Sequence, residues 1–214
     1  NVSCYGEDDG SAWIASVGGV PTYIYFWSNG DSSSTMPSTA DSLFHGGYYV
    51  TTRDALGCEV VDSIYISEPE PLSMEAFELD WIDCFGDNNG LAYATAVGGT
   101  APYNFVWDND SLNPGDTINN LTPGLHTVVV TDAKGCWASD TVFTHEPDSL
   151  QVDIIDGMTV LAYCIGVNTA SLTAIASGGT PGYAYEWNDN AVNPQTTTTA
   201  SSLLAGVYTI TVTD

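Results

Sequence analysis

Residues 18–27 read GGVPTYIYFW, residues 98–107 read GGTAPYNFVW, and residues 178–187 read GGTPGYAYEW. The three stretches begin 80 residues apart, and in each of them large aromatic residues occupy every second position up to a tryptophan. A period of two places these side chains on one face of a β-strand. Because repetition at a fixed period decides the architecture, the sequence predicts a tandem array of three β-domains.

Other segments recur with the same period. Segments rich in β-branched and aromatic residues, YYVTTRD, HTVVVTD and YTITVTD, end at Asp54, Asp132 and Asp214. The segments EVVDSIYI and ASDTVFT are expected to form the strands that follow. We expect PLSMEAFELDWID and DSLQVDIIDGMTVLAY to begin their domains. Many short strands separated by Gly, Asn and Asp turns predict an all-β array of Ig-like or PKD-like β-sandwiches.

The repeats are predicted to occupy residues 1–69, 70–147 and 148–214, called here the first, second and third repeat. The boundaries fall at Glu68–Pro71 and at Glu146–Pro147, because proline favours an extended linker and removes a backbone donor. The second repeat is expected to be complete. The first is expected to lack its first strand, and the third its closing cysteine and last strand.

Cysteines stand near both ends of the first two repeats. They are 54 residues apart in the first repeat (58 − 4) and 52 apart in the second (136 − 84). This spacing predicts the disulfides Cys4–Cys58 and Cys84–Cys136, with Cys164 unpaired. A zinc site is disfavoured, because there is no CxxC spacing and the three histidines are scattered. Disulfides in turn imply an oxidising location outside the cytoplasm.

The charge of the chain is strongly one-sided. Two basic residues stand against 27 acidic ones, which gives a formal net charge of −25. Such a surface repels nucleic acids and anionic membranes, and it attracts divalent cations. Apolar residues make up 43% of the chain, which is enough for packed cores, and no apolar run has transmembrane length. We therefore expect neither a nucleic-acid partner nor membrane insertion.

Acidic and amide side chains cluster in the loops after the first cysteines and near the linkers. They are candidate calcium ligands, since calcium takes six to eight oxygens: Asp8, Asp9, Glu68, Asp83, Asp87 and Asn89. An ion there could fix the angle between domains. The alternative is that Asp and Asn only form turns, and the EF-hand pattern is absent. No other cofactor is expected.

The six tryptophans divide into two groups. Three recur at the end of the aromatic strands and are predicted to be core residues: Trp27, Trp107 and Trp187. The other three have no tryptophan at the equivalent positions and are candidate exposed contact residues: Trp13, Trp81 and Trp137. They would either stack on sugars or pack against neighbouring domains, and the second interpretation is favoured.

Catalytic motifs are missing from the sequence. It has no GxSxG, no HExxH and no glycine-rich phosphate loop before a helix, and its histidines are dispersed. We therefore expect that the protein is not an enzyme.

The repeat resembles a known family. The ordered elements C[YF]G, Gly-Gly, Pro, Tyr, Trp and Thr-Asp-x-x-Gly-Cys are similar to the SprB-type repeat of very large Bacteroidetes cell-surface proteins, including gliding-motility adhesins. The third repeat departs from the pattern with CIGVNTASL and without the closing cysteine. The resemblance implies secretion to the cell surface and a role in adhesion or filament building, and it supplies no catalytic residues.

A second resemblance concerns modification. The pattern Asp-[Ser/Thr]-apolar occurs six times and is similar to the O-glycosylation site of secreted Bacteroidetes proteins. The acceptors would be Ser42, Ser63, Ser111, Thr117, Thr141 and Ser149. The alternative is that Ser and Thr simply abound in an acidic β-protein.

Two functions remain open. The array is either a structural stalk or filament module, or a set of modules that bind surface glycans or calcium and contact the substratum. Unlike loops on similar scaffolds favour the stalk, because a shared binding site would recur. The expected partners are neighbouring repeats of the same chain, and in addition surface polysaccharide or other filament subunits.

Overall fold

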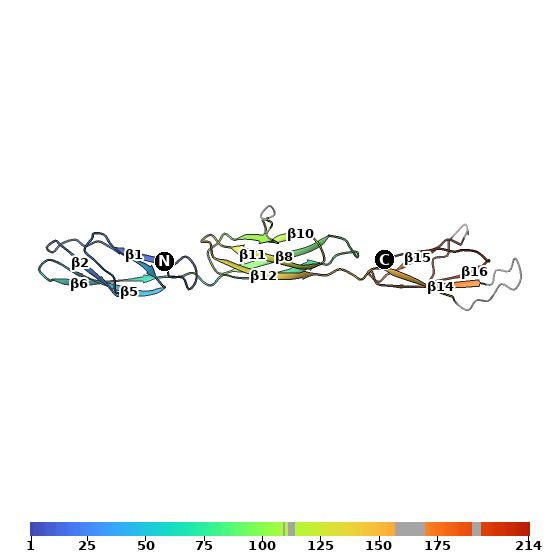
Figure 1. Ribbon diagram of the computed structural model, residues 1–214, viewed down its shortest axis with the longest axis horizontal. Coiled ribbons are helices and arrows are strands. Elements are labelled where there is room, and N and C mark those ends of the chain that lie inside the picture. The colour runs from blue at the N-terminus through green and yellow to red at the C-terminus, as the bar shows by residue number, and fades with distance from the viewer. Residues whose placement is uncertain (109, 111–113, 157–169, 190–193) are drawn as a thin grey trace. The chain divides into compact units, whose positions relative to one another are not determined.

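The structure is a computed structural model of the 214-residue chain, and it describes residues 1–108, 110, 114–156, 170–189 and 194–214. Every regular element in these ranges is a β-strand, so the predicted all-β class is confirmed (Figure 1). Within the same ranges, the structure contains no helix that is long and apolar enough to cross a membrane.

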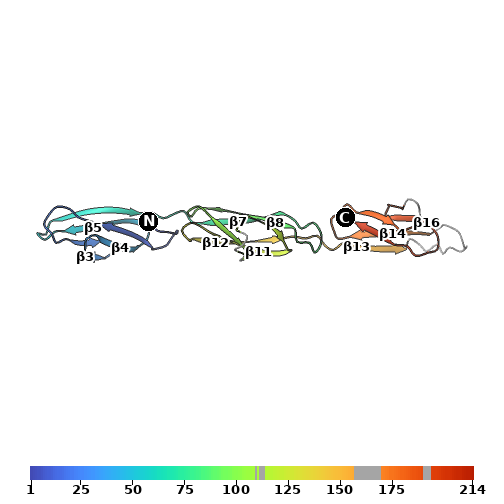
Figure 2. The same cartoon turned by 90° about the horizontal axis from the view of Figure 1, so that it is seen from above.

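The first repeat contains two antiparallel sheets. The strands are β1 (Gly10–Ile14), β2 (Ile24–Trp27), β3 (Ser32–Ser33), β4 (Ser38–Leu43), β5 (Gly46–Arg53) and β6 (Glu59–Ile66). One sheet pairs β1 with β4, and the other has the order β3-β2-β5-β6. Strand β1 also contacts β6 across the two sheets, which can be followed in Figures 1 and 2. This is a two-layer sandwich.

The second repeat has the same plan. Its strands are β7 (Ser73–Asp80), β8 (Gly90–Val97), β9 (Asn104–Trp107), β10 (Thr117–Leu121), β11 (Gly124–Thr131) and β12 (Trp137–Thr144). They form the sheets β10-β8-β7 and β12-β11-β9. The equivalent central strands pair in equivalent registers, Tyr25 opposite Thr52 in the first repeat and Phe105 opposite Val130 in the second.

The third repeat continues the pattern. Its described strands are β13 (Gln151–Asp156), β14 (Ala170–Ser177), β15 (Ala184–Trp187), β16 (Thr199–Leu203) and β17 (Ile210–Thr213). The sheets are β13-β14-β16 and β15-β17, and Tyr185 pairs with Val212. Three Ig-like sandwiches in tandem are thus confirmed.

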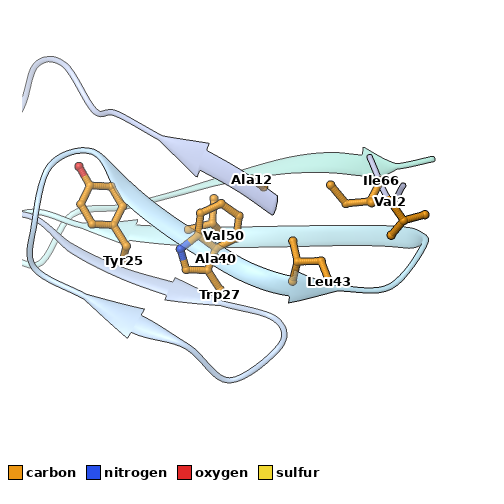
Figure 3. Packing of buried hydrophobic residues seen from close by; sticks show 8 residues of the cluster. All are labelled: Val2, Ala12, Tyr25, Trp27, Ala40, Leu43, Val50 and Ile66. Atoms are coloured by element: carbon orange, nitrogen blue, oxygen red, sulfur yellow. The ribbon is translucent and has the colours of Figure 1, made fainter. Parts of the chain in front are cut away.

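The aromatic strands form the cores, as the alternation predicts. Trp27, Trp107 and Trp187 are all buried. In the first repeat Trp27 packs against Val50 from β5 and Ala40 from β4, between the two sheets (Figure 3). Burying an aromatic side chain of this size removes about 150–250 Å² from water, which makes it a dominant contribution to each small core.

The contacts of the chain divide it into two compact units. The first comprises residues 1–77, 93–118 and 126–142, and the second comprises residues 78–92, 119–125 and 143–214. The predicted repeat boundaries lie outside strands, between β6 and β7 and between β12 and β13. Their role as domain boundaries stays a prediction.

Candidate functional site: a disulfide between two repeats

One disulfide is present among the described residues, and it joins Cys4 of the first repeat to Cys136 of the second, with 5.6 Å between the two Cα atoms. Both cysteines belong to the first compact unit. Cys58 and Cys84 are exposed free thiols. The predicted pairs Cys4–Cys58 and Cys84–Cys136 are therefore wrong.

Strand β6 explains why the first predicted pair does not form. Cys58 directly precedes β6, whereas Cys4 lies beside the segment that follows it, since the Val2 amide donates to the Ser67 carbonyl at 3.0 Å. A strand of eight residues is about 26 Å long, and a disulfide requires Cα atoms within about 7 Å. Cys4 and Cys58 are thus at opposite ends of one sandwich.

The second predicted pair has the same problem. Cys136 directly precedes β12, which is also eight residues long. The turn that contains Cys84 is attached to the segment after this strand, because the Gly86 amide donates to a Glu146 carboxylate oxygen at 2.8 Å. The residue spacing that suggested one bridge per domain does not record that a strand separates the two cysteines.

The turn that carries Cys136 is organised by Asp132, whose carboxylate is buried. One of its oxygens accepts from the amides of Lys134 and Cys136 at 2.8 and 3.0 Å, and the other accepts from the Thr100 amide at 2.7 Å. Desolvation acts to raise the pKa of Asp132, but the three amide donors outweigh it and hold that pKa below its ordinary value. A charged carboxylate therefore fixes the turn and the cysteine.

The Gly-Gly pair brings this turn close to the preceding loop. Gly99 has φ of +57°, and a Cβ there would lie 2.6 Å from the Asp132 carboxylate oxygen. Only glycine combines this backbone conformation with so close an approach. The same contact between loop and turn recurs in all three repeats: Val20 amide to Asp54 at 3.0 Å, Thr100 amide to Asp132 at 2.7 Å, and Thr180 amide to Asp214 at 2.7 Å.

The turn that carries Cys4 is held by two carboxylates. Asp9 accepts from the Ser3 amide at 2.8 Å, and this bond lowers the pKa of Asp9. Glu68, in the linker, accepts from the Gly6 amide at 2.9 Å and contacts His45 Nδ1 at 3.1 Å through its other oxygen. Both halves of the disulfide are thus positioned by carboxylates that accept from backbone amides.

These carboxylates include residues that the sequence suggested as calcium ligands. Asn89 accepts from the Asp83 amide at 3.1 Å, as Asp9 accepts from Ser3. Asp8 and Asp87 are exposed. In the part of the chain that the structure describes, no group of three or more His, Cys, Asp or Glu side chains is close enough to hold a metal ion. The calcium site stays a prediction.

The three non-recurring tryptophans are exposed, by 70% at Trp13, 62% at Trp81 and 70% at Trp137. Trp81 stacks on the ring of His145, with 5.1 Å between centroids, and Phe143 contacts the same ring edge-on. The His145 ring in turn lies 2.7 Å from Glu78. Their predicted role in contacts is untested.

The described glycosylation candidates are all on the surface: Ser42, Ser63, Thr117, Thr141 and Ser149. Ser42 has φ of +54°, and the equivalent residues Asn120 and Ser202 have φ of +57° and +59°, so this backbone conformation is structural. The remaining candidate, Ser111, lies outside the described residues, as does Cys164.

Sequence reasoning missed the residues that hold the cysteines. Asp54, Asp132 and Asp214 recur, and the Glu-Pro pairs of both linkers recur at Glu68 and Glu146. This recurrence was the signal available, because the linker glutamates do more than mark boundaries: each binds the amide of a cysteine-bearing turn.

A family model described as the SprB repeat matches residues 1–32, 82–112 and 162–192. The chain contains three SprB repeats. The matched segments contain the first cysteine, the Gly-Gly pair and the aromatic strand of each repeat. SprB repeats belong to cell-surface proteins, so this chain is an adhesin-type structural module with an extracellular or surface location, and modules of this kind are typically non-catalytic.

Two solved structures share the sandwich fold. One is described as the amphioxus IgVJ-C2 molecule, with 15% identity, a TM-score of 0.30, and coverage of 65% of this chain and 98% of that one. The other comes from work on Dscam isoform specificity, with 10% identity, a TM-score of 0.28, and coverage of 95% and 62%. Comparison with curated proteins finds no match.

Proposed function

We propose that this SprB array is a load-bearing stalk of a large cell-surface adhesin or filament, and that it carries out no catalysis. The observation that carries the proposal is the disulfide between Cys4 and Cys136. A bridge from one repeat to the next lets tension pass between repeats through a covalent bond. Adhesion and gliding motility are the settings that the SprB identity supports, with neighbouring repeats and other filament subunits as partners.

The bridge has a mechanical consequence that can be measured. It spans a sequence separation of 132 residues, which corresponds to about 460 Å of extended chain. When the two termini are pulled apart, this length stays closed while the bridge is intact. A stalk of this kind resists extension even after its sandwiches have unfolded.

Single-molecule force spectroscopy tests the proposal. We expect the variant C4S/C136S to extend by about 460 Å more than the oxidised wild-type chain when it is fully unfolded. The control C58S removes an exposed free thiol and should extend like the wild type. Equal extension of the wild type and the double variant would contradict a covalent load path.

A second candidate function is glycan binding, and the exposed Trp81–His145 stack favours it. Aromatic faces on a surface are suited to stacking on sugar rings. Binding of the purified array to surface polysaccharide should then be lost in Trp81→Ala and kept in Trp107→Phe, whose ring is in the core. No binding by the wild type on a broad glycan array would leave the stalk as the function.

A further inference from the structure

The two free thiols are located in turns that match the two halves of the disulfide. Cys84 is in the same turn as Cys4: the Asp87 amide donates to the Cys84 carbonyl at 3.0 Å, as the Glu7 amide donates to the Cys4 carbonyl at 3.3 Å. Each turn is also attached to a linker glutamate, Gly6 to Glu68 in one case and Gly86 to Glu146 in the other.

Cys58 corresponds in the same way to Cys136. The Cys58 amide donates to Asp54 at 2.9 Å, and the Cys136 amide donates to Asp132 at 3.0 Å. The chain therefore contains two types of cysteine, one in a turn of the Cys4 type and one in a turn of the Cys136 type. The disulfide joins one of each type.

The residues that bring the two types together in the first compact unit recur in the second. In the first unit, the Gly99 amide donates to the linker carbonyl of Glu70 at 2.8 Å. In the second, the Gly179 amide donates to the linker carbonyl of Asp148 at 2.6 Å, and the Thr180 amide donates to Asp214 at 2.7 Å, as Thr100 does to Asp132.

Asp214 also acts directly on Cys84. Partial desolvation, followed by the negative charges of Asp87, Asp214 and Asp83, raises the pKa of the Cys84 thiol. Asp214 occupies the position that Asp132 has in the second repeat, and Cys136 comes four residues after Asp132. The recurring bonds thus place a residue four positions after Asp214 close to Cys84.

We propose that disulfides in this array are staggered by one repeat: the first cysteine of each repeat pairs with the closing cysteine of the next. Cys4–Cys136 is one such bridge, Cys84 is the acceptor for a cysteine four residues after Asp214, and Cys58 is the acceptor for the first cysteine of a repeat placed before it. This pairing rule deepens the proposed stalk function, because it provides a covalent link at every junction.

The chemistry of each bridge is an ordinary thiol oxidation. Two thiols lose two protons and two electrons as the sulfur–sulfur bond forms, and a small-molecule disulfide such as oxidised glutathione takes the electrons and leaves as two thiols. Exposure of Cys58 and Cys84 permits attack by such an oxidant. Their separation within the chain's own repeats keeps them from pairing with the cysteines Cys4 and Cys136 that the earlier prediction gave them.

Extending the chain tests the rule. The full chain is produced with four added residues, Ala-Lys-Gly-Cys, after Asp214; these are residues 133–136 of its own second repeat. After oxidation with a glutathione buffer, peptide mapping without reduction should find the added cysteine bridged to Cys84, beside Cys4–Cys136. Pairing of the added cysteine with Cys164, within one repeat, would overturn the rule, and so would a mixture of partners.

Matched variants sharpen the result. Ala-Lys-Gly-Ser in place of the added segment should leave Cys84 as a thiol, and C84S should leave the added cysteine free. In a second arm, residues 1–80 are placed before Asn1, and the Cys4 of that copy should bridge Cys58. Failure of these pairings refutes the rule without touching the load-bearing proposal, which rests on Cys4–Cys136 and on the force measurement.

Discussion

Three aspartates at equivalent positions hold equivalent turns, and the best buried of them is Asp132. Its carboxylate accepts three amide hydrogen bonds, and an Asn side chain could keep only those that reach its single carbonyl oxygen. We expect Asp132→Asn to lower the free energy of unfolding by about 1 kcal/mol. Denaturant unfolding measures the change. Asp80→Asn, an exposed site with the same change of charge, should have little effect.

The pH dependence of that effect follows from the pKa. Because the pKa of Asp132 is depressed in the folded state, its contribution to stability is present above the ordinary value of 3.8 and is lost as the pH falls through the folded-state pKa. The difference in melting temperature between wild type and Asp132→Asn should therefore shrink in acid. A difference that stays constant down to pH 2 would contradict this role.

Two buried hydroxyls in the first core have no hydrogen-bond partner, and they belong to cross-strand neighbours, Tyr25 and Thr52. The second repeat has Phe105 and Val130 in this pair. An unsatisfied buried polar group costs about 1–3 kcal/mol. We expect Tyr25→Phe and Thr52→Val each to raise the melting temperature of the protein.

Tyr23→Phe is the matched control for Tyr25→Phe. It removes a hydroxyl that donates to the Gly18 carbonyl at 2.5 Å, a bond that recurs in the other repeats, so this variant should be less stable than the wild type. Equal effects of the two substitutions would show that the hydroxyl of Tyr25 has a partner in solution.

At the scale of the elements, strands β4, β10 and β16 end alike. A residue with positive φ precedes a buried leucine in each, and in β4 these are Ser42 and Leu43. A left-handed conformation costs a residue other than glycine about 1–2 kcal/mol, and most for a β-branched one. Ser42→Val should therefore destabilise the first repeat and Ser42→Gly should stabilise it, as thermal melting would show. Asp41→Val, at the neighbouring position, should change stability less.

Strands were predictable where large side chains alternate. The aromatic strands, and the strands after the second cysteines, appear in the structure where the sequence placed them. Strands β1, β8 and β14 were not identified, because their inward side chains are small: Ala92 and Ala94 in β8 are fully buried and carry little periodic signal. Packing against the large tryptophan of the facing sheet requires such small residues, and the sequence alone does not reveal that pairing.

At the scale of the whole molecule, the repeat period was predictable and the disulfide was not. Spacing in the sequence counts residues, whereas a bridge depends on which end of a sandwich each cysteine occupies. Strand β6 takes the chain from Cys58 to the opposite end of the first sandwich, and the Glu68 linker then attaches the Cys4 turn there. A rule that pairs cysteines inside one repeat cannot represent this offset.

The bridge should contribute strongly to thermal stability. In the chain-entropy model, closing a loop with a sequence separation of 132 residues stabilises the folded state by about 5 kcal/mol. We expect C4S/C136S to melt at a lower temperature than the wild type under oxidising conditions and at the same temperature under reducing ones. C58S/C84S should melt like the wild type in both. A loss of stability in the second variant would show that the exposed thiols have a structural role.

Net charge acts on the molecule as a whole. At −25, repulsion between carboxylates opposes folding, and added salt weakens it by screening. The oxygens of Asp9, Glu68 and Asn89 near the cysteine turns already accept backbone amides, so a calcium ion would have to compete with these bonds. We expect sodium chloride and calcium chloride to raise the melting temperature equally at matched ionic strength. A bound ion demands a geometry and saturates, whereas screening does neither. A calcium response that saturates, is absent with sodium, and disappears in Asp9→Asn but not in Asp80→Asn would overturn this expectation and establish calcium at the turn beside the disulfide.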